Sequence, residues 1–307
     1  MIEKQLKLHA YCIITILFFS TIEVVGKLIG KGISPYAITA WRFLIGGFIM
    51  LPFAIREMRV NRVQIGAKGY LGFAIAGILN VCISMLCLQF SIFYGKANLA
   101  ALIVSSNPLF VTIFAATLIK ERISRLQIIG IGIGLSGLLL ILLGENEAIM
   151  NSSNLAMAVV FGLIASTTFA FSTVYSKKLI MQFGNLVTLC FAFFFGSATL
   201  FGYSVLTHQP LIFTPNLRNI VLLLYLGIFV SGIAYIMYFK AIKIIGAAKA
   251  SIYFFLKPAI ACTLAWLIQG ETLKAGQIVG IILIMMSLSR AYIMKLFIKA
   301  PTLRESL

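Results

Sequence analysis

The chain consists of long apolar stretches separated by short clusters of charged, glycine and proline residues. A helix rises about 1.5 Å per residue, so about 20 apolar residues cross a hydrocarbon layer about 30 Å thick. Ten stretches approach or exceed this length, five in each half of the chain. The pattern therefore predicts an all-α membrane protein with ten transmembrane helices. Their predicted bounds are 10–29, 36–55, 68–92, 97–118, 126–143, 155–176, 186–206, 219–239, 247–268 and 275–294.

Composition limits what else the chain can contain. Hydrophobic residues make up 61% of the 307 residues and charged residues 11%, which is too apolar for a protein dissolved in water. Ten spans use about 200 residues, so no room is left for an extramembrane catalytic or DNA-binding domain. The five cysteines form no CxxC pair and there are two histidines, so neither a disulfide framework nor a metal centre is expected.

The formal charge of +17 has a topological explanation. In a soluble chain it would suggest nucleic acid or another anionic partner. Here 18 of the 25 lysines and arginines fall in loops on one predicted side of the membrane, and four fall on the other. Because positive loops resist translocation, this bias predicts that both termini are cytoplasmic. No nucleic-acid partner is expected, and the remaining three basic residues, Lys27, Arg42 and Lys257, lie inside predicted spans.

The two halves of the chain repeat at an offset of 150 residues. Matches between polar residues and prolines carry this register, because apolar matches arise by chance in so hydrophobic a chain. They pair Lys27 with Lys177, Pro108 with Pro258, Glu121 with Glu271 and Gln127 with Gln277. Each half holds five spans, an odd number, so the second half enters the membrane from the opposite side. The sequence predicts two inverted five-helix repeats, at 10–143 and 155–294, and a cytoplasmic tail at 295–307. Such repeats are typical of transporters and also occur in channels.

Residues 97–141 and their counterpart at 247–286 carry a family resemblance. Each stretch has an alanine-rich helix start, a mid-helix proline, a glutamate after the helix and a glycine-containing final helix. This combination resembles the paired repeats of the drug/metabolite transporter superfamily, EamA branch, and the resemblance extends from about residue 10 to 294. It implies ten helices around a central cavity and a secondary carrier, in a branch that often exports amino acids or other small metabolites.

Three ionisable residues lie within the first two predicted spans, namely Glu23, Lys27 and Arg42. Such groups cost roughly 2.5 to 3.5 kcal/mol inside a membrane, so each is a functional candidate. Glu23 and Arg42 lie at similar predicted depths, and Lys27 is one turn from Glu23 on the same helical face. Two hypotheses follow: Glu23 forms an ion pair with Arg42 or Lys27 that fixes the two helices, or Glu23 acts in gating or proton coupling.

Lys257 lies near the middle of the ninth predicted span, immediately before Pro258. Proline removes one backbone donor and clashes with the carbonyl four residues earlier, so polar backbone is exposed beside a cation. Interrupted helices of this kind bind substrates in transporters. The repeat counterpart of Lys257 is Asn107, before Pro108. Either Lys257 faces the cavity and contacts an anionic group such as a carboxylate, or it pairs with Glu23.

Further polar and aromatic groups could complete the cavity. Tyr253 is one turn from Lys257 and shares its helical face. For each of these groups, packing or anchoring at the membrane interface is the simpler interpretation, because 12% of the residues are aromatic. The candidates are Asn80, Gln89, Ser106, Tyr175, Tyr235, Tyr253 and Trp266.

A glutamate follows the fourth span of each repeat, at Glu121 and Glu271. An acid near a helix N-terminus is stabilised by the helix dipole, so these residues are interpreted as capping or fixing the loop before the next helix. The glycine-rich span after Glu121 contains a GxGxxG match, which after a strand would indicate a dinucleotide site. Its place inside a membrane span favours close helix packing through Gly130 and Gly134 instead.

These observations predict an inner-membrane secondary transporter that moves a small metabolite, an amino acid or related carboxylate, by alternating access. The resemblance favours export. The chain has no ATP-binding P-loop motif, so a substrate or proton gradient would supply the energy, with the proton as the candidate coupling ion. No cofactor or metal is expected. A channel-like facilitator is an alternative, and so is an intramembrane lipid-modifying enzyme, although the chain lacks HExxH and GxSxG motifs.

Overall fold

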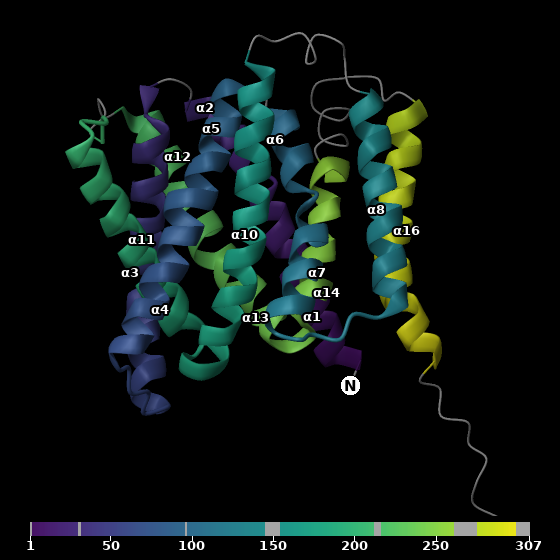
Figure 1. Ribbon diagram of the computed structural model, residues 1–307, viewed down its shortest axis with the longest axis horizontal. Helices are drawn as coiled ribbons and strands as arrows, with labels where there is room; N and C mark the ends of the chain where they lie inside the picture. The colour runs from purple at the N-terminus through teal and green to yellow at the C-terminus, as the bar shows by residue number, and fades with distance from the viewer. Residues whose placement is uncertain are drawn as a thin grey trace, which may run out of the picture.

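A computed structural model describes residues 2–29, 32–95, 97–144, 154–211, 216–260 and 275–298. The regular structure in these ranges is helical, and the helices run side by side as a bundle (Figure 1). The predicted tail at 295–307 lies outside the described residues beyond position 298. The first half of the chain forms α1 (Ile2–Phe19), α2 (Ile22–Ile29), α3 (Pro35–Val60), α4 (Ala67–Gly77), the π-helical segment η2 (Ile78–Met85), α5 (Leu86–Tyr94), α6 (Ala97–Val104), α7 (Asn107–Leu118) and α8 (Arg125–Gly144).

The second half repeats this order of long and interrupted helices. Its π-helical segment η3 falls at nearly the same register as η2, and a short 3₁₀ segment, η4, precedes Lys257. The elements are α10 (Leu155–Phe183), α11 (Asn185–Leu206), α12 (Leu217–Tyr225), η3 (Leu226–Ala234), α13 (Tyr235–Ile245), α14 (Ala247–Ser251), η4 (Ile252–Phe255) and α16 (Ala275–Ile298).

Seven stretches of the described chain are long and apolar enough to cross a membrane. Two shorter apolar helices, Arg125–Ile141 and Ile278–Ser287, fall within the predicted fifth and tenth spans, whereas the predicted ninth span is described only as far as residue 260. The chain is therefore a helical membrane protein that spans the bilayer several times, and the count of ten stays a prediction. The seven stretches are His9–Ile29, Pro35–Val60, Ala67–Tyr94, Leu99–Leu118, Leu155–Phe183, Asn185–Leu206 and Leu217–Ile245.

The first span is divided in two at Ser20 and Thr21, a break that the apolar pattern did not predict. The Ser20 hydroxyl donates to the carbonyl oxygen of Ile16 at 2.7 Å, and the Thr21 hydroxyl donates to that of Phe18 at 2.7 Å. Side-chain bonds of this kind compete with the helical backbone pattern and bend helices. The break places Glu23 in the first turn of α2, where the helix dipole stabilises a negative charge.

Close helix crossings follow the 150-residue register. Where α3 crosses η3, a Cβ on Gly46 would lie 3.3 Å from the carbonyl oxygen of Gly227. Where α11 crosses the junction of α4 and η2, a Cβ on Gly196 would lie 2.6 Å from the carbonyl oxygen of Gly77. Backbones approach this closely because glycine has no side chain. Gly196 is the register counterpart of Gly46, and Gly227 is that of Gly77. The same glycine contact therefore occurs twice, with the two halves of the chain exchanged.

Helices α8 and α16 pack against each other at one edge of the bundle (Figure 1). The Ser287 hydroxyl donates to the carbonyl oxygen of Gly130 at 2.6 Å, and a Cβ on Gly137 would lie 2.7 Å from the carbonyl oxygen of Gly280. Gly130 and Gly280 are register counterparts, as are Gly137 and Ser287. Gly130 contacts α16 as predicted, but the second glycine at this contact is Gly137 and not Gly134. Gly134 instead packs against an aromatic ring of η4.

Candidate functional site

A buried ion pair joins the two halves of the chain. Lys257 Nζ lies 2.5 Å from Glu23 Oε1, with side chains 1% and 2% exposed. The second carboxylate oxygen of Glu23 has no hydrogen-bond partner among the described residues. A pair this dry is costly to form, and removing either partner would leave an uncompensated buried charge. Of the two hypotheses for Lys257, the geometry shows the pair with Glu23, and the partner of Glu23 is neither Arg42 nor Lys27.

The backbone around Lys257 is irregular on both sides. The 3₁₀ segment η4 ends two residues before Lys257, and Pro258, which follows it, has no backbone N–H and cannot complete the helical hydrogen-bond pattern. The helix nevertheless continues through the described residues as far as position 260. The lysine therefore projects from a locally tightened helix and not from a helix end.

The equivalent point in the first half is a more complete break. A turn at Ser105 and Ser106 separates α6 from α7, which begins at Asn107 and Pro108. Asn107 Nδ2 donates to the carbonyl oxygen of Ser166 at 3.1 Å, while its Oδ1 has no partner among the described residues. The Ser106 hydroxyl donates to a carbonyl in its own turn at 2.6 Å. Asn107 thus retains a free acceptor, whereas Ser106 is satisfied locally.

The start of α3 is fixed two turns before Arg42. The Ser34 hydroxyl accepts a hydrogen bond from the backbone N–H of Ala37 at 3.1 Å, and Pro35 occupies the first helical position. Serine at this position satisfies an otherwise unpaired N–H, and proline is favoured in the first turn. The cap therefore determines how deep Arg42 lies in the bundle.

Arg42 is a third buried charge. Its side chain is 1% exposed, and its guanidinium carbon lies 4.7 Å from the centroid of the Phe43 ring. The charge is close enough to Glu23 and Tyr235 to interact with both electrostatically. Nevertheless, Nε, Nη1 and Nη2 have no hydrogen-bond partner in the described part of the chain. The donors of Arg42 are therefore available to another group.

An aromatic cluster surrounds Tyr235 beside these charges. Its ring centroid lies 5.2 Å from that of Phe19, 5.6 Å from that of Phe43 and 5.1 Å from that of Phe193. The Tyr235 hydroxyl donates to Oδ1 of Asn80 at 3.4 Å. The structure therefore brings Asn80 and Tyr235 together, inside close-packed rings that four different helices contribute.

The remaining aromatic candidates have other neighbours. Tyr253 is buried, and its hydroxyl is hydrogen-bonded to Nδ1 of His9. Tyr175 on α10 stacks on Phe171, with ring centroids 6.5 Å apart. Trp266 lies outside the described residues. Within the described ranges, no group of three or more histidine, cysteine, aspartate or glutamate side chains could hold a metal ion.

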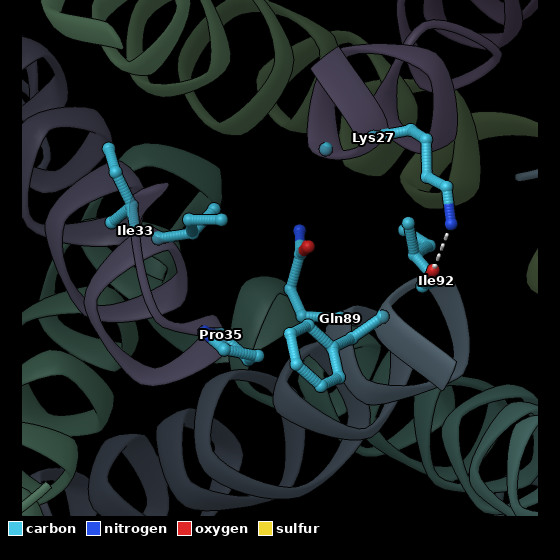
Figure 2. A pocket seen from close by; sticks show the side chains of 8 residues that line it. Lys27, Ile33, Pro35, Gln89 and Ile92 are labelled. Carbon is cyan, nitrogen blue, oxygen red and sulfur yellow. Dashed lines mark hydrogen bonds between the residues drawn. The ribbon is translucent and has the colours of Figure 1, made fainter. Parts of the chain in front are cut away.

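A cavity of about 150 Å³, here called the Lys27 cavity, lies where α2 ends and α3 begins. Figure 2 shows the Gln89 amide in the middle, with Lys27 and Ile92 on one side and Ile33 and Pro35 on the other. Gln89 is 3% exposed, and its Nε2 has no partner among the described residues. Lys27 Nζ donates to the carbonyl oxygen of Gly95 at 2.8 Å. The cavity thus combines an unpaired amide donor with an exposed cation.

The opposite end of the bundle, here called the Glu121 end, is closed by contacts between the halves. Glu121 lies between α7 and α8, and its Oε2 accepts from Lys177 Nζ at 2.8 Å and from the backbone N–H of Ala247 at 3.1 Å. The preceding Gly246 has a φ of 95°. Glu121 therefore caps α14 of the second half and not α8, the next helix in sequence. Its counterpart Glu271 lies outside the described residues.

A second glutamate caps a helix of the other half in the same way, and no sequence motif marks it. Glu57 Oε2 accepts from the backbone N–H groups of Leu186 and Val187 at 2.8 and 3.1 Å. Glu57 lies past the predicted end of the second span, and its register counterpart is Thr207, so no repeat pattern marks it. Its partners are found only when α11 is placed beside α3.

The start of α8 has its own cap, which the sequence does signal. The Ser124 hydroxyl accepts from the backbone N–H of Gln127 at 3.2 Å, and the Gln127 side-chain oxygen accepts from the backbone N–H of Ser124 at 2.8 Å. This reciprocal pair is the capping box expected of serine followed three residues later by glutamine. The spacing alone would have identified the helix start.

Comparison with known proteins agrees with this architecture. Residues 6–143 and 156–291 each match the EamA-like transporter family. The chain is 37% identical over 282 residues to an uncharacterized transporter of Clostridium kluyveri, covering 90% of both chains. It is 27% identical to the uncharacterized inner membrane transporter YedA of Escherichia coli K12, covering 78% of this chain and 76% of that one. A solved crystal structure shares the fold, with a TM-score of 0.75, 17% identity and coverage of 96% of this chain and 99% of that chain. The chain therefore belongs to the EamA-like transporter family, in the drug/metabolite transporter superfamily, and is a multi-pass membrane transporter.

Proposed function

We propose that this protein is a secondary active transporter of the inner membrane that exports a small metabolite, an amino acid or related carboxylate, by alternating access. The buried ion pair between Glu23 and Lys257 carries the proposal, because it joins α2 of the first half to the irregular helix of the second half. Ionisable groups in such settings mark substrate or ion pathways. Asn107, with its free acceptor, adds a polar group at the equivalent register position.

The proposed arrangement is two inverted five-helix repeats, at 10–143 and 155–294. The exchanged crossings of α3 with η3 and of α11 with η2 support it, as do the reciprocal contacts between α8 and α16. A site between inverted halves can open to either face as the two halves exchange conformations. This property is what a carrier needs and a static pore does not.

The two ends of the bundle support alternating access. With both termini in the cytoplasm, as the distribution of basic residues favours, the Lys27 cavity faces outward and the Glu121 end faces the cytoplasm. Contacts of Glu121 with Lys177 and Ala247 tie the halves together at the cytoplasmic end. The conformation is therefore interpreted as outward-facing, with the inward path closed.

Glu23 is the proposed point of proton coupling. Among the described residues it is the one carboxylate that is buried. A proton bound there would cancel its charge and break the pair with Lys257, so the buried cations would attract a substrate carboxylate more strongly. Proton binding and carboxylate binding would then favour each other, so the proton and the substrate would cross the membrane together and the gradient of either could drive the other.

Counterflow into proteoliposomes tests the proposed function. Purified protein is reconstituted with unlabelled amino acids or carboxylates inside, and uptake of the labelled compound is measured. A carrier shows trans-stimulation and saturation, whereas uptake that does not respond to the inner substrate would indicate a channel-like facilitator. A second experiment tests the direction of transport and its coupling to protons. It measures whether an imposed pH gradient makes the labelled substrate accumulate inside inverted membrane vesicles. Glu23→Gln should abolish the dependence on that gradient, and transport that stays pH-dependent would exclude coupling through Glu23.

A further inference from the structure

The buried charges of the described chain do not balance. Within the described ranges three charged side chains are buried, namely Glu23, Arg42 and Lys257. Two are cations and one is an anion, so the cluster carries a net charge of +1. An isolated charge out of water is strongly unfavourable, and buried charges are normally paired. The guanidinium of arginine does not lose its proton in proteins, so the imbalance cannot be removed by titrating Arg42.

The imbalance is located on Arg42. Lys257 is bonded to Glu23 at 2.5 Å, whereas the three guanidinium nitrogens of Arg42 have no partner in the described part of the chain. The guanidinium carries five donors in a planar fork that matches the two oxygens of a carboxylate. A neutral ligand could accept these hydrogen bonds, but it could not cancel the charge.

The Lys27 cavity reaches α3 at Ile38, one helical turn before this group. Its lining residue Ile38 lies one helical turn before Arg42 on α3, and Lys27 lies one turn after Glu23 on α2. One turn of helix is about 5.4 Å. The buried amide of Gln89 lines the cavity, and its Nε2 has no partner within the described ranges. An anion in the cavity would therefore have Lys27 and the Gln89 amide in its wall, with Arg42 one helical turn beyond Ile38.

We propose that Arg42 is the anion-binding residue of this transporter, and that its ligand is a small monocarboxylate with one net negative charge that enters through the Lys27 cavity. The transport step rests on the function proposed above, whereas the binding step does not. Arg42 takes the carboxylate, and the pair of Glu23 and Lys257 stays intact beside it. A bound monoanion brings the cluster to zero net charge.

The charge count discriminates among ligands. A zwitterionic amino acid could place its carboxylate on Arg42 and its ammonium near the free oxygen of Glu23, but the cluster would keep its charge of +1. A dicarboxylate would overcompensate to −1. The Lys27 cavity has a volume of about 150 Å³, similar to that of an enclosed cavity that holds benzene, a molecule with about six non-hydrogen atoms. Monocarboxylates of up to about six such atoms therefore fit best.

Thermal stabilisation of the detergent-purified full chain tests this site. The probes are the sodium salts of acetate, propionate, butyrate and pyruvate, compared with butyramide and alanine at equal ionic strength. Butyrate, butyramide and alanine have the same number of non-hydrogen atoms, so they differ in charge but hardly in size. At least one monocarboxylate should raise the melting temperature in a saturable way, with binding at least tenfold tighter than that of butyramide or alanine. Equal or stronger stabilisation by butyramide or alanine, or no stabilisation by any of the four salts, would overturn the proposal.

Variants locate the effect. Arg42→Gln should abolish the stabilisation, and Arg42→Lys, which keeps the charge but loses the fork, should weaken binding at least tenfold. Arg59→Gln is the matched control, because Arg59 lies on the same helix and is exposed. If Arg42→Gln does not fold, the double variant Glu23→Gln/Lys257→Gln serves instead. It removes the ion pair but keeps the net charge of +1, so it should still bind the carboxylate. Loss of binding in the double variant, or its persistence in Arg42→Gln, would contradict the assignment.

The outcome is separable from that of the proposed function. Counterflow of alanine, together with no Arg42-dependent binding of any monocarboxylate, would leave the transporter function standing and overturn the anion site. Carboxylate binding that depends on Arg42, without counterflow of any probe, would confirm the anion site and overturn the proposed transport of these compounds.

Discussion

Among the described residues, two ion pairs join the first half of the chain to the second, and they differ chiefly in their surroundings. Glu23 and Lys257 meet with side chains 2% and 1% exposed, whereas Glu121 and Lys177 meet with 15% and 18% exposed. The first carboxylate has a free oxygen, while the second also accepts from the backbone of Ala247. The chemistry of the charges is the same in both pairs, so any difference in behaviour must come from solvent access and from the extra backbone contact.

The difference assigns the two pairs different tasks. Without water, separating Glu23 from Lys257 leaves two uncompensated charges, so this pair persists unless a proton or a ligand replaces a partner. At the Glu121 end, both side chains are partly exposed, so water can solvate each charge when the pair opens and breaking this pair costs less. The partly exposed pair of Glu121 and Lys177 is therefore suited to be a clasp, meaning a contact between the halves that opens in each transport cycle. The dry pair of Glu23 and Lys257 is suited to a site where charge is exchanged.

Glu23→Gln should cause the largest loss of stability, about 3 to 5 kcal/mol, because it leaves Lys257 buried without a counter-charge. Unfolding in mixed micelles of dodecyl sulfate and dodecyl maltoside measures the effect. The double variant Glu23→Gln/Lys257→Met should recover most of the loss, since it removes both charges. A single-variant loss below about 1 kcal/mol, the range of exposed pairs, would show that water reaches this pair and would end the contrast.

Gly246→Ala should rank second, at about 1 to 3 kcal/mol, the cost of a strained backbone conformation. Gly246 has a φ of 95°, and a Cβ there would collide with the carboxylate of Glu121. Adding Glu121→Ala removes the collision but not the backbone strain, so the same micelle assay should show partial recovery. Gly184→Ala is the matched case, with a φ of 96° and a Cβ 2.6 Å from Cδ of Glu57. Full recovery in the double variant would mean that the backbone conformation contributes nothing.

The dry pair of Glu23 and Lys257 also shows which features of the site can be predicted from the sequence. Apolar runs located the seven stretches that are long enough to cross a membrane, because that signal is local. Depth along the first two predicted spans placed Glu23 and Arg42 at similar levels. Depth does not give the rotation of a helix, and for that reason Lys257 had two candidate contacts until the helices were packed together. That the donors of Arg42 lack partners among the described residues is harder still to predict from the sequence, because it depends on every element that packs around them.

For the partly exposed pair of Glu121 and Lys177, different features could not be predicted from the sequence. Capping by a glutamate was expected at Glu121, but the capped helix begins 126 positions later in the chain, a distance that no local motif covers. Glu57 lies in no motif, and its register counterpart is a threonine and not a glutamate. By contrast, the Ser124 and Gln127 capping box and the Ser20 and Thr21 break both have local signals. Local signals therefore give helix ends, and contacts between the two halves require the fold.

Glu121→Gln should have a small effect on stability, about 0.5 to 1 kcal/mol, because it removes the charge opposite Lys177 but keeps an oxygen for the Ala247 N–H. Its effect on opening should be larger. In a cysteine-free background, a cysteine at Ser251, which is buried one turn into α14, should react faster with a membrane-impermeant maleimide. Glu57→Gln is the control, because its contacts in the described chain are to backbone N–H groups. Equal acceleration in both variants would show that the ion pair is not the clasp.

Lys27→Gln should give the smallest change in stability, within about 0.5 kcal/mol, as expected for an exposed side chain. Its register counterpart Lys177 loses a carboxylate partner in Lys177→Gln and should therefore lose more. The kinetics of ligand binding should reverse this order. Lys27 lies at the mouth of the cavity, so removing its charge should slow the association of a carboxylate with detergent-purified protein, and the difference should shrink as added salt screens the charge. Stopped-flow measurement at low and high salt separates the cases: slowing that persists at high salt would mean that Lys27 shapes the cavity and does not attract the anion.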